Sequence, residues 1–380
     1  MADAGLSSDC IVVGGGLVGA SIAYGLARSG ASVIVLDEDD KALRATRGNF
    51  GLIWVQNKGI SMPQYSAWSR DAARLWPGFA GQLLTETGVD VNLQQPGGFC
   101  LCLSEAELLE REQSLLAIQK AVSGDYPFEM LDQQALRQRL PAIGPEVVGA
   151  SFTPMDGHVN PLKLYLALLQ ACRQMGVRIC HAAHAGKIEA SDDKGFRLSC
   201  GPVNYRAGKI VLAAGLGNRA LAEQVGLYAP VVPTRGQVLV TERLRKFLDY
   251  PTNKLRQTDE GAVHIGDSVE DVGFDDRTTT DVLQFMARRA VKSFPLLRDV
   301  NLVRAWGALR VMTPDGFPLY EQSMAHPGAY VVTCHSGVTL AAAHALRVAP
   351  WIAGGSVPAE ISEFTSARFS QGLARPMYVN

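Results

Sequence analysis

Three glycines near the start of the chain have the spacing of a phosphate-binding turn. Residues 10–13, Cys-Ile-Val-Val, form a hydrophobic run that leads directly into Gly14, Gly16 and Gly19 in the pattern Gly-x-Gly-x-x-Gly. The first glycine of such a pattern permits a tight turn, the second lets the backbone approach a pyrophosphate, and the third lets a helix pack closely on a strand. The N–H groups at the start of that helix then favour an anion.

The segments around these glycines complete a βαβ unit. Residues 20–28 are predicted to form a helix, and residues 32–36, Ser-Val-Ile-Val-Leu, a second strand that ends at Asp37. A carboxylate at that position suits the hydroxyl groups of a ribose and would repel a 2′-phosphate. The sequence therefore predicts a dinucleotide site, and on these residues alone the ligand could be NAD or FAD.

Composition argues against several other classes of protein. The chain has 380 residues, 47% of them hydrophobic, and a formal net charge of −1, without a basic stripe that would indicate nucleic acid. We see no secretory signal pattern and no apolar run long enough to cross a membrane, so we expect a cytoplasmic protein without an integral membrane span. The cysteines form no Cys-x-x-Cys pair, and the Cys180-His181-x-x-His184 cluster is expected to be structural or exposed, so no metal site is predicted.

The order of the predicted elements indicates two interleaved domains. Residues 209–215, Lys-Ile-Val-Leu-Ala-Ala-Gly, form a buried strand that ends in glycine, which favours an FAD protein whose nucleotide domain resumes after an insertion. The strands around residues 236–241 and 263–269 indicate an antiparallel sheet. We therefore predict an α/β fold in which a Rossmann-like FAD-binding domain is interleaved with an α+β substrate domain built on that sheet. The FAD-binding domain is assigned residues 1–90, 146–225 and 307–380, and the substrate-binding domain residues 91–145 and 226–306.

Local signals define several further elements. Helices are predicted for residues 62–87, 105–122, 161–176 and 280–291, the second opened by a capping box of Ser104 and Glu107 and the third by Asn160. Residues 306–318 are expected to form a loop-rich strand region. The segment 335–340 follows a strand and is expected to open the last helix, with Ser336 or Thr339 as ordinary caps.

Over essentially its whole length the chain resembles the D-amino-acid oxidase superfamily of FAD-dependent oxidoreductases. The segments that carry the resemblance are the N-terminal unit to Asp37, residues 44–51, 159–161, 211–215, 233–237, 307–310, 313–316 and 335–340. Within the superfamily, residues 48–53 and 335–340 are similar to the small flavin (β) subunit of heteromeric opine oxidases or dehydrogenases and of D-hydroxyproline dehydrogenases. The cyanide-forming glycine dehydrogenase subunits are similar as well.

The resemblance implies FAD as the cofactor. Relatives of sarcosine oxidase attach FAD through a cysteine just before a Thr-Pro-Asp turn, whereas this chain has Arg310-Val-Met-Thr313 there, so noncovalent FAD is implied. Asp37 stands where the superfamily more often has Glu. The expected FAD contacts are Gly14, Gly16, Leu17, Val18, Gly19, Asp37, Glu38, Arg44, Thr46, Gly48, Asn49, Phe50, Gly51, Ala214, Gly215, Arg310, Gly337, Val338 and Thr339.

Arg310 is the main expected substrate anchor. A guanidinium holds a carboxylate through two parallel hydrogen bonds, and Arg310 matches the position of such an arginine in the superfamily. Arg235 and Arg304 are the alternatives for a second carboxylate. His264 could reach the substrate amine, and His335 could lie beside the flavin. The N-terminus of the last helix is expected to stabilise negative charge on the reduced flavin.

The resemblance also implies a reaction. It is oxidation of the C–N bond of an amino acid or secondary amine, such as the opines octopine and nopaline, to an imine that hydrolyses to an amino acid and a keto acid. The chain would be the catalytic β subunit of a hetero-oligomer with larger and smaller redox subunits that carry a second flavin or a [2Fe–2S] cluster and could hold it at the inner membrane. The alternatives are a D-hydroxyproline, glycine or sarcosine dehydrogenase or oxidase, an NAD-dependent dehydrogenase, and a non-catalytic flavoprotein subunit.

Overall fold

A mostly parallel sheet forms the centre of the part of the molecule that contains the glycine turn. The computed structural model describes residues 6–38, 45–191, 195–266 and 268–371. In sheet order, the strands are β16 (Leu319–Gln322), β17 (Ala329–Thr333), β11 (Val203–Leu212), β1 (Leu6–Val13), β2 (Val33–Leu36) and β8 (Arg178–Cys180), with β10 (Gly195–Cys200) beside β11 and β9 (Ile188–Ser191) beside β10. The strands from β17 to β8 run parallel, so their carboxyl ends lie at one edge.

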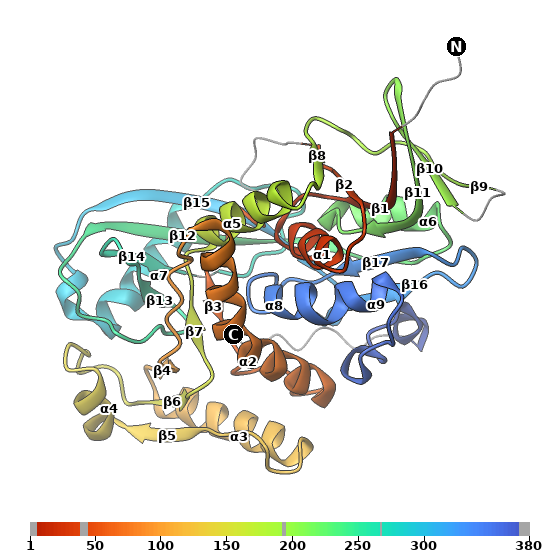
Figure 1. Cartoon of the computed structure of the whole chain (residues 1–380). Helices are drawn as coiled ribbons and strands as arrows, with labels where there is room; N and C mark the ends of the chain where they lie inside the picture. The colour runs from red at the N-terminus through yellow and green to blue at the C-terminus, as the bar shows by residue number, and fades with distance from the viewer. Residues whose placement is uncertain (1–5, 39–44, 192–194, 267, 372–380) are drawn as a thin grey trace.

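Helices cover both faces of this sheet, and the strands are buried accordingly. Along β1, Cys10 and Val12 enter one hydrophobic core while Ile11 and Val13 enter another. The first core contains α1 (Leu17–Arg28), α5 (Pro161–Gln174), α8 (Ala341–Ala343), the π-helical turn His344–Val348 and α9 (Ala349–Ala353), and Figure 1 shows α1 beside α8 and α9. The short α6 (Asn218–Glu223) contacts β11 and β17. Burial on both faces is the usual reason why parallel strands are continuously apolar.

A second sheet, antiparallel throughout, occupies the other part of the molecule (Figure 1). Its strands in order are β13 (Leu255–Gln257), β14 (Ala262–Ile265), β12 (Val232–Arg243) and β15 (Leu302–Met312), and α7 (Thr280–Ser293) packs against it. The loop-rich strand region predicted at residues 306–318 is a regular strand in its first half, because β15 pairs with β12 from Met312 back to Leu302. Gly307 fits this strand because a Cβ there would overlap the carbonyl oxygen of Asp276.

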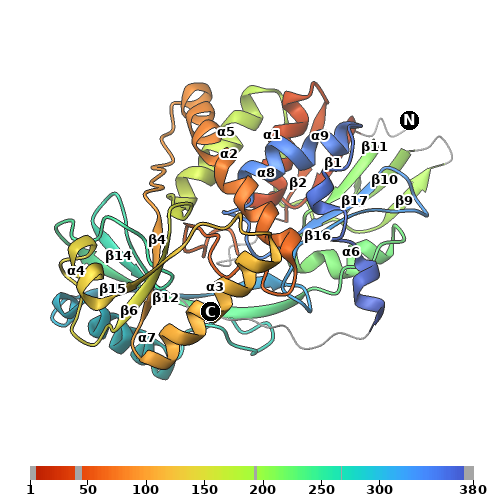
Figure 2. The ribbon, with the colours of Figure 1, turned by 90° about the horizontal axis from the view of Figure 1, so that it is seen from below.

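A smaller sheet extends this part of the molecule. It comprises β4 (Gly98–Cys102), β6 (Gly149–Thr153) and β5 (Glu129–Asp132), with α3 (Glu105–Ala121) and α4 (Gln133–Arg139) packed on it, as Figure 2 shows from below. Its Phe99 and Leu101 share one hydrophobic core with Leu239 and Ile265 of the larger antiparallel sheet. The pairing places β6 with this sheet, although the predicted boundary lies at residue 146.

One long helix joins the two parts. α2 (Pro63–Thr87) follows the short strand β3 (Leu52–Ile53), which pairs with β7 (Gly157–His158). The predicted apolar side of α2 is buried at Trp68, Trp76, Phe79 and Leu83 and half-buried at Leu75. Because α2 contacts α5, α8 and α3, it fixes the position of the residues that precede it. Single 3₁₀ turns lie at Gly215–Gly217, Pro295–Leu297, Ala359–Ile361 and Ser366–Gln371.

Candidate functional site

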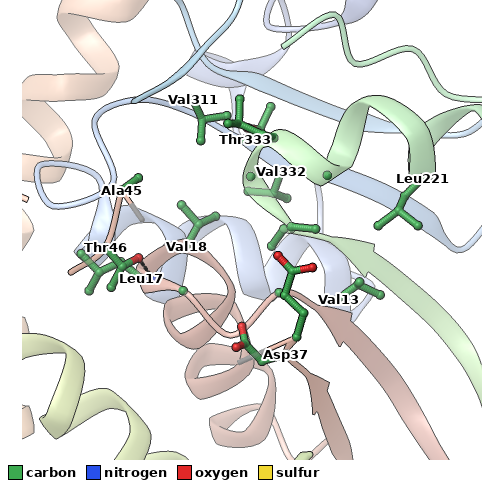
Figure 3. Close-up of a pocket in the computed structure, with 18 of the residues that line it drawn as sticks. Val13, Leu17, Val18, Asp37, Ala45, Thr46, Leu221, Val311, Val332 and Thr333 are labelled. Carbon is green, nitrogen blue, oxygen red and sulfur yellow. Dashed lines mark hydrogen bonds between the residues drawn. The ribbon is translucent and has the colours of Figure 1, made fainter. Parts of the chain in front are cut away.

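The carboxyl ends of three parallel strands open into a cavity of about 500 Å³, called the first cavity below. Val13 ends β1 and Gly14 follows it, Asp37 follows β2, and the segment Ala213–Gly217 follows β11. Figure 3 shows Asp37 and Leu17 on one side of this cavity and Val311 and Thr333 on the other. A crevice outside the carboxyl ends of parallel strands is where α/β folds bind nucleotides.

The glycine turn brings three backbone segments together at the base of the cavity. Gly14 has a φ of +100°, and a Cβ there would overlap the carbonyl oxygen of Ala213. A Cβ at Gly19 would overlap the carbonyl oxygen of Gly14 itself. Side chains at these positions would therefore push α1 away from the strands and fill the space at the turn. The close packing without side chains is what the sequence pattern predicts.

Polar groups surround the turn at the start of α1. The amide of Gly15 donates to Oδ2 of Asp37 at 2.6 Å, and the amide of Leu17 donates to Oγ1 of Thr46 at 2.9 Å. Glu38 lies 3.3 Å from Nδ1 of His184, and both residues line the cavity. Carboxylate and hydroxyl groups are therefore placed where the ribose and phosphates of a dinucleotide would lie.

A second cavity of about 870 Å³ adjoins the first. The two share Ala45, Asn49, Leu309 and His335 as lining residues, so they are parts of one continuous site. The second cavity lies beside the antiparallel sheet, and Arg310 of β15 is one of its walls. An elongated ligand bound in the first cavity would have its far end in the second.

Backbone carbonyls fix the half-buried Arg310 side chain in the second cavity. Its Nη1 donates to the carbonyl oxygens of Ser268 at 2.7 Å and Arg235 at 3.2 Å. The two alternatives to Arg310 lie elsewhere. Arg235 is 3% exposed and ion-paired with Glu270 at 2.6 Å, whereas Arg304 is exposed and stacks on Trp306. Neither alternative is among the described residues that line the two cavities.

The two candidate histidines occupy different environments. His335 lines both cavities, and its Nε2 lies 3.1 Å from Oγ of Ser336. His264 is not among the described residues that line either cavity, and its ring packs between Phe50 and Trp306. Burial, together with the charge of Arg256, lowers the pKa of His264 to about 3, so this side chain is neutral at physiological pH.

Besides Lys254, which lines the second cavity, two cations in or behind the site escaped the sequence analysis, and Lys58 is the first. It lines the second cavity and donates from Nζ to Oγ of Ser336 at 2.5 Å and to the hydroxyl of Tyr65 at 3.0 Å. The segment before Lys58 is fixed in position, because the amide of Val55 and the side chain of Gln56 donate hydrogen bonds to the buried Asp156. A lone lysine in a polar loop gives no local signal of this role.

The second is Arg256, which lies behind the loop predicted to contact the flavin. Its Nε donates to the carbonyl oxygen of Phe50, and its Nη2 lies 3.2 Å from Nδ1 of His264. Burial lowers its pKa to about 10, so it remains charged at neutral pH. Asn49 supports the same loop by accepting the amide of Gly51 at 2.7 Å.

The structure also changes the expected start of the last helix. Regular α-helix begins at Ala341, with Leu340 as its N-cap residue and no side-chain capping bond. Ser336 does not cap it but bonds to Lys58 and Tyr65, while Oγ1 of Thr339 accepts the amide of Trp54 at 3.1 Å. The prediction that residues 335–340 open the helix is therefore wrong by several residues, because Ser336 and Thr339 bond to α2 and to the segment before it.

The remaining predicted FAD contacts gather around the two cavities. The first cavity is lined by Gly14, Gly16, Leu17, Val18, Asp37, Glu38, Thr46, Asn49, Ala214, Gly215 and Gly337. The second is lined by Gly48, Asn49, Phe50, Arg310, Val338 and Thr339, and also by Trp54. Gly19 and Gly51 lie in the supporting backbone, and Arg44 lies outside the described residues.

Comparison with known proteins identifies the family. The family model named DAO, FAD dependent oxidoreductase, matches residues 9–351. The chain belongs to this family. It is 46% identical to an opine oxidase subunit of Agrobacterium tumefaciens (strain Ach5) over 362 residues, which cover 95% of this chain and 97% of that protein. It is 26% identical to hydrogen cyanide synthase subunit HcnC of Pseudomonas aeruginosa, across 95% of this chain and 96% of that protein.

Solved structures of other enzymes have the same fold. Glycine oxidase from Geobacillus kaustophilus superposes with a TM-score of 0.87 at 22% identity, covering 95% of this chain and 98% of that one. L-proline dehydrogenase from P. horikoshii superposes with a TM-score of 0.83 at 20% identity, covering 98% and 100%. The predicted superfamily and fold class are thus confirmed.

The protein is therefore an FAD-dependent oxidoreductase of amino acids or amines, as predicted. The family assignment removes the NAD-dependent alternative. The cofactor also fits this chain, because the glycine turn leaves room that any Cβ would fill and the first cavity continues into the second.

Replacing Gly19 with Ala tests whether the glycine turn is needed for FAD binding. The added Cβ overlaps the Gly14 carbonyl, so we expect FAD content to fall about tenfold, within the ~1–3 kcal/mol that overpacking costs. Visible flavin absorbance per protein is the measurement. Gly81→Ala, at an exposed position of α2 with open space around it, is the control and should keep full FAD content. Equal FAD content in the two variants would contradict this role of the turn.

Acid precipitation tests the mode of FAD attachment. Cys334 lines the first cavity, but burial raises the pKa of its thiol to about 12, so it is not a thiolate that could bond to the flavin ring. We expect all the flavin in the supernatant after precipitation of the protein. Flavin that stays in the washed pellet would show a covalent link.

Proposed function

We propose that this protein oxidises the C–N bond of an opine, a secondary amine whose two neighbouring carbons both carry carboxylates. The observation that carries the proposal is the second cavity, where Lys58, Lys254 and Arg310 line one space that continues into the FAD cavity. The similarity to opine oxidase subunits of two bacteria, at 46% and 44% identity, supports the same substrate class. Octopine and nopaline are the first compounds to test.

Arg310 and Lys58 have distinct tasks in this proposal. Arg310, fixed by its bonds to two carbonyl oxygens, binds one substrate carboxylate in bidentate fashion. Lys58, held by Ser336 and Tyr65, binds the other carboxylate as a point charge. Asp271, exposed at the same cavity, suits the cationic end of octopine.

The reaction removes two electrons and two protons from the CH–NH unit and leaves a C=N bond. Bound FAD supplies the acceptor for the hydride equivalent. A protonated amine must first lose a proton, and we assign its acceptance to His335, which lies at the junction of the cavities. Water then adds to the imine carbon, and breakage of the C–N bond releases an amino acid and a keto acid.

We further infer that the chain is the catalytic subunit of a heteromeric dehydrogenase. The support is that two of its relatives are each named as one subunit of an opine oxidase. The described residues contain no group of three or more His, Cys, Asp or Glu that could hold a metal ion. Larger and smaller partner subunits with a second flavin or a [2Fe–2S] cluster would take the electrons onward. These partners would also hold the chain at the inner membrane. No helix of the described part could cross a membrane.

Arg310→Met tests the substrate anchor. We expect KM for octopine to rise about 100-fold, because truncating one partner of a buried charge pair costs ~2–5 kcal/mol. FAD content should stay unchanged. Arg304→Met, at an exposed position on the same strand, is the matched control and should leave KM within about twofold of the native value. Similar KM values for the two variants would remove Arg310 from the site.

Lys58→Met tests whether the site recognises two carboxylates. Binding of succinate and of acetate, each followed by perturbation of the flavin spectrum, separates the second carboxylate from the first. We expect the Kd of succinate to rise about tenfold while that of acetate changes little, since the lost charge-assisted bond is worth ~1.5–3 kcal/mol. Lys120→Met, at an exposed position near the end of α3, is the control. Equal weakening of both ligands would contradict the assignment of Lys58.

A further inference from the structure

A third cavity of about 380 Å³ lies between α3, α7 and the strands β13 and β14. In Figure 2 both helices lie apart from α1 and β1, the elements on either side of the glycine turn. Two bonds join the helices at its edge, where Arg289 of α7 donates to both carboxylate oxygens of Glu107 of α3, at 3.0 and 2.7 Å. Arg111 of α3 also lines this cavity.

Arg111 is a buried cation without a counter-ion in contact. Arg111 is 7% exposed, and its Nη1 is buried with no hydrogen-bond partner. Among the residues that the structure describes, none forms an ion pair with it within 4 Å. Glu107, one turn away, is engaged by Arg289, and this bonding holds the pKa of Glu107 below its ordinary value. A buried N–H group without a hydrogen-bond partner is costly, so Nη1 of this guanidinium needs an acceptor.

The cavity is large enough for such an acceptor, and its charge is positive. Arg111, Arg289 and Lys254 line it together with two carboxylates, Glu107 and Glu110. Since Glu107 and Arg289 compensate each other, positive charge remains around Arg111. Asn253 adds a neutral amide to the same wall.

We propose that the third cavity is a second anion site, which binds a small oxyanion through Arg111. The ligand is a carboxylate or a phosphate, the two groups whose planar or tetrahedral oxygens match a guanidinium. Asn253 and Lys254 line both the third and the second cavity, so the two anion sites share one wall. Occupancy of the third cavity therefore changes the field that a substrate carboxylate meets in the second.

Calorimetric titration of the FAD-loaded protein with sodium acetate, and separately with inorganic phosphate, tests the site. The flavin spectrum reports binding in the second cavity, whereas heat reports binding anywhere, so the two readouts separate the sites. We expect heat from binding that leaves the spectrum unperturbed and that Arg111→Met abolishes. Arg310→Met should instead remove the spectral change and keep this heat. Whichever of acetate and phosphate binds more tightly shows whether the ligand is a carboxylate or a phosphate.

Arg288→Met is the matched control, because Arg288 is exposed on α7 and does not line the cavity. It should bind both anions as the native protein does. Arg111→Lys keeps the charge if the methionine variant fails to fold, and its Kd should rise at least about tenfold because a bidentate contact is lost. Heats of binding like those of the native protein in both Arg111→Lys and Arg111→Met would overturn the proposal. So would the absence, in the native protein, of any binding heat that is not accompanied by a change in the flavin spectrum.

Discussion

The close approach of α1 to the carboxyl ends of β1 and β11 is the constraint on which the rest of the structure depends. The backbone of Gly19 touches that of Gly14, and Gly14 in turn touches Ala213, so three elements meet without a side chain between them. Because β1 lies between β2 and β11, their ends and the helix N-terminus surround one crevice. The predicted FAD site is therefore a property of this backbone packing, and the polar side chains around it would select a dinucleotide rather than create the space.

Lysine and arginine side chains, rather than histidines, set the charge of the adjoining site. Arg310 lies on β15, Lys58 before α2 and Lys254 before β13, so three distant segments supply positive charge to one cavity. Arg256 lies behind the loop at Phe50 that is predicted to contact the flavin. Its charge and burial together keep His264 neutral. A cavity with fixed cations suits a substrate with more than one carboxylate, which is how the family's oxidative chemistry becomes selective in this account.

The sequence predicted what depends on neighbouring residues. Ser104 accepts the amide of Glu107, and Asn160 caps α5, because capping needs only a few consecutive residues. The glycine turn and the family followed from similarly local patterns. Lys58 and Arg256 could not be found in this way, since their roles depend on Asp156, Ser336 and Phe50, which come from other parts of the chain. The regularity of β15 and its start at Leu302 were missed for the same reason, because its partner β12 lies far away in sequence.

Anaerobic mixing of the FAD-loaded protein with one equivalent of octopine tests the central claim most directly. The account predicts that the visible flavin absorbance bleaches in a single turnover and that one equivalent each of amino acid and keto acid appears after hydrolysis. D-Hydroxyproline, glycine and sarcosine should bleach the flavin far more slowly under the same conditions. Persistent flavin colour with octopine and nopaline, together with rapid bleaching by one of these smaller amino acids, would contradict the account.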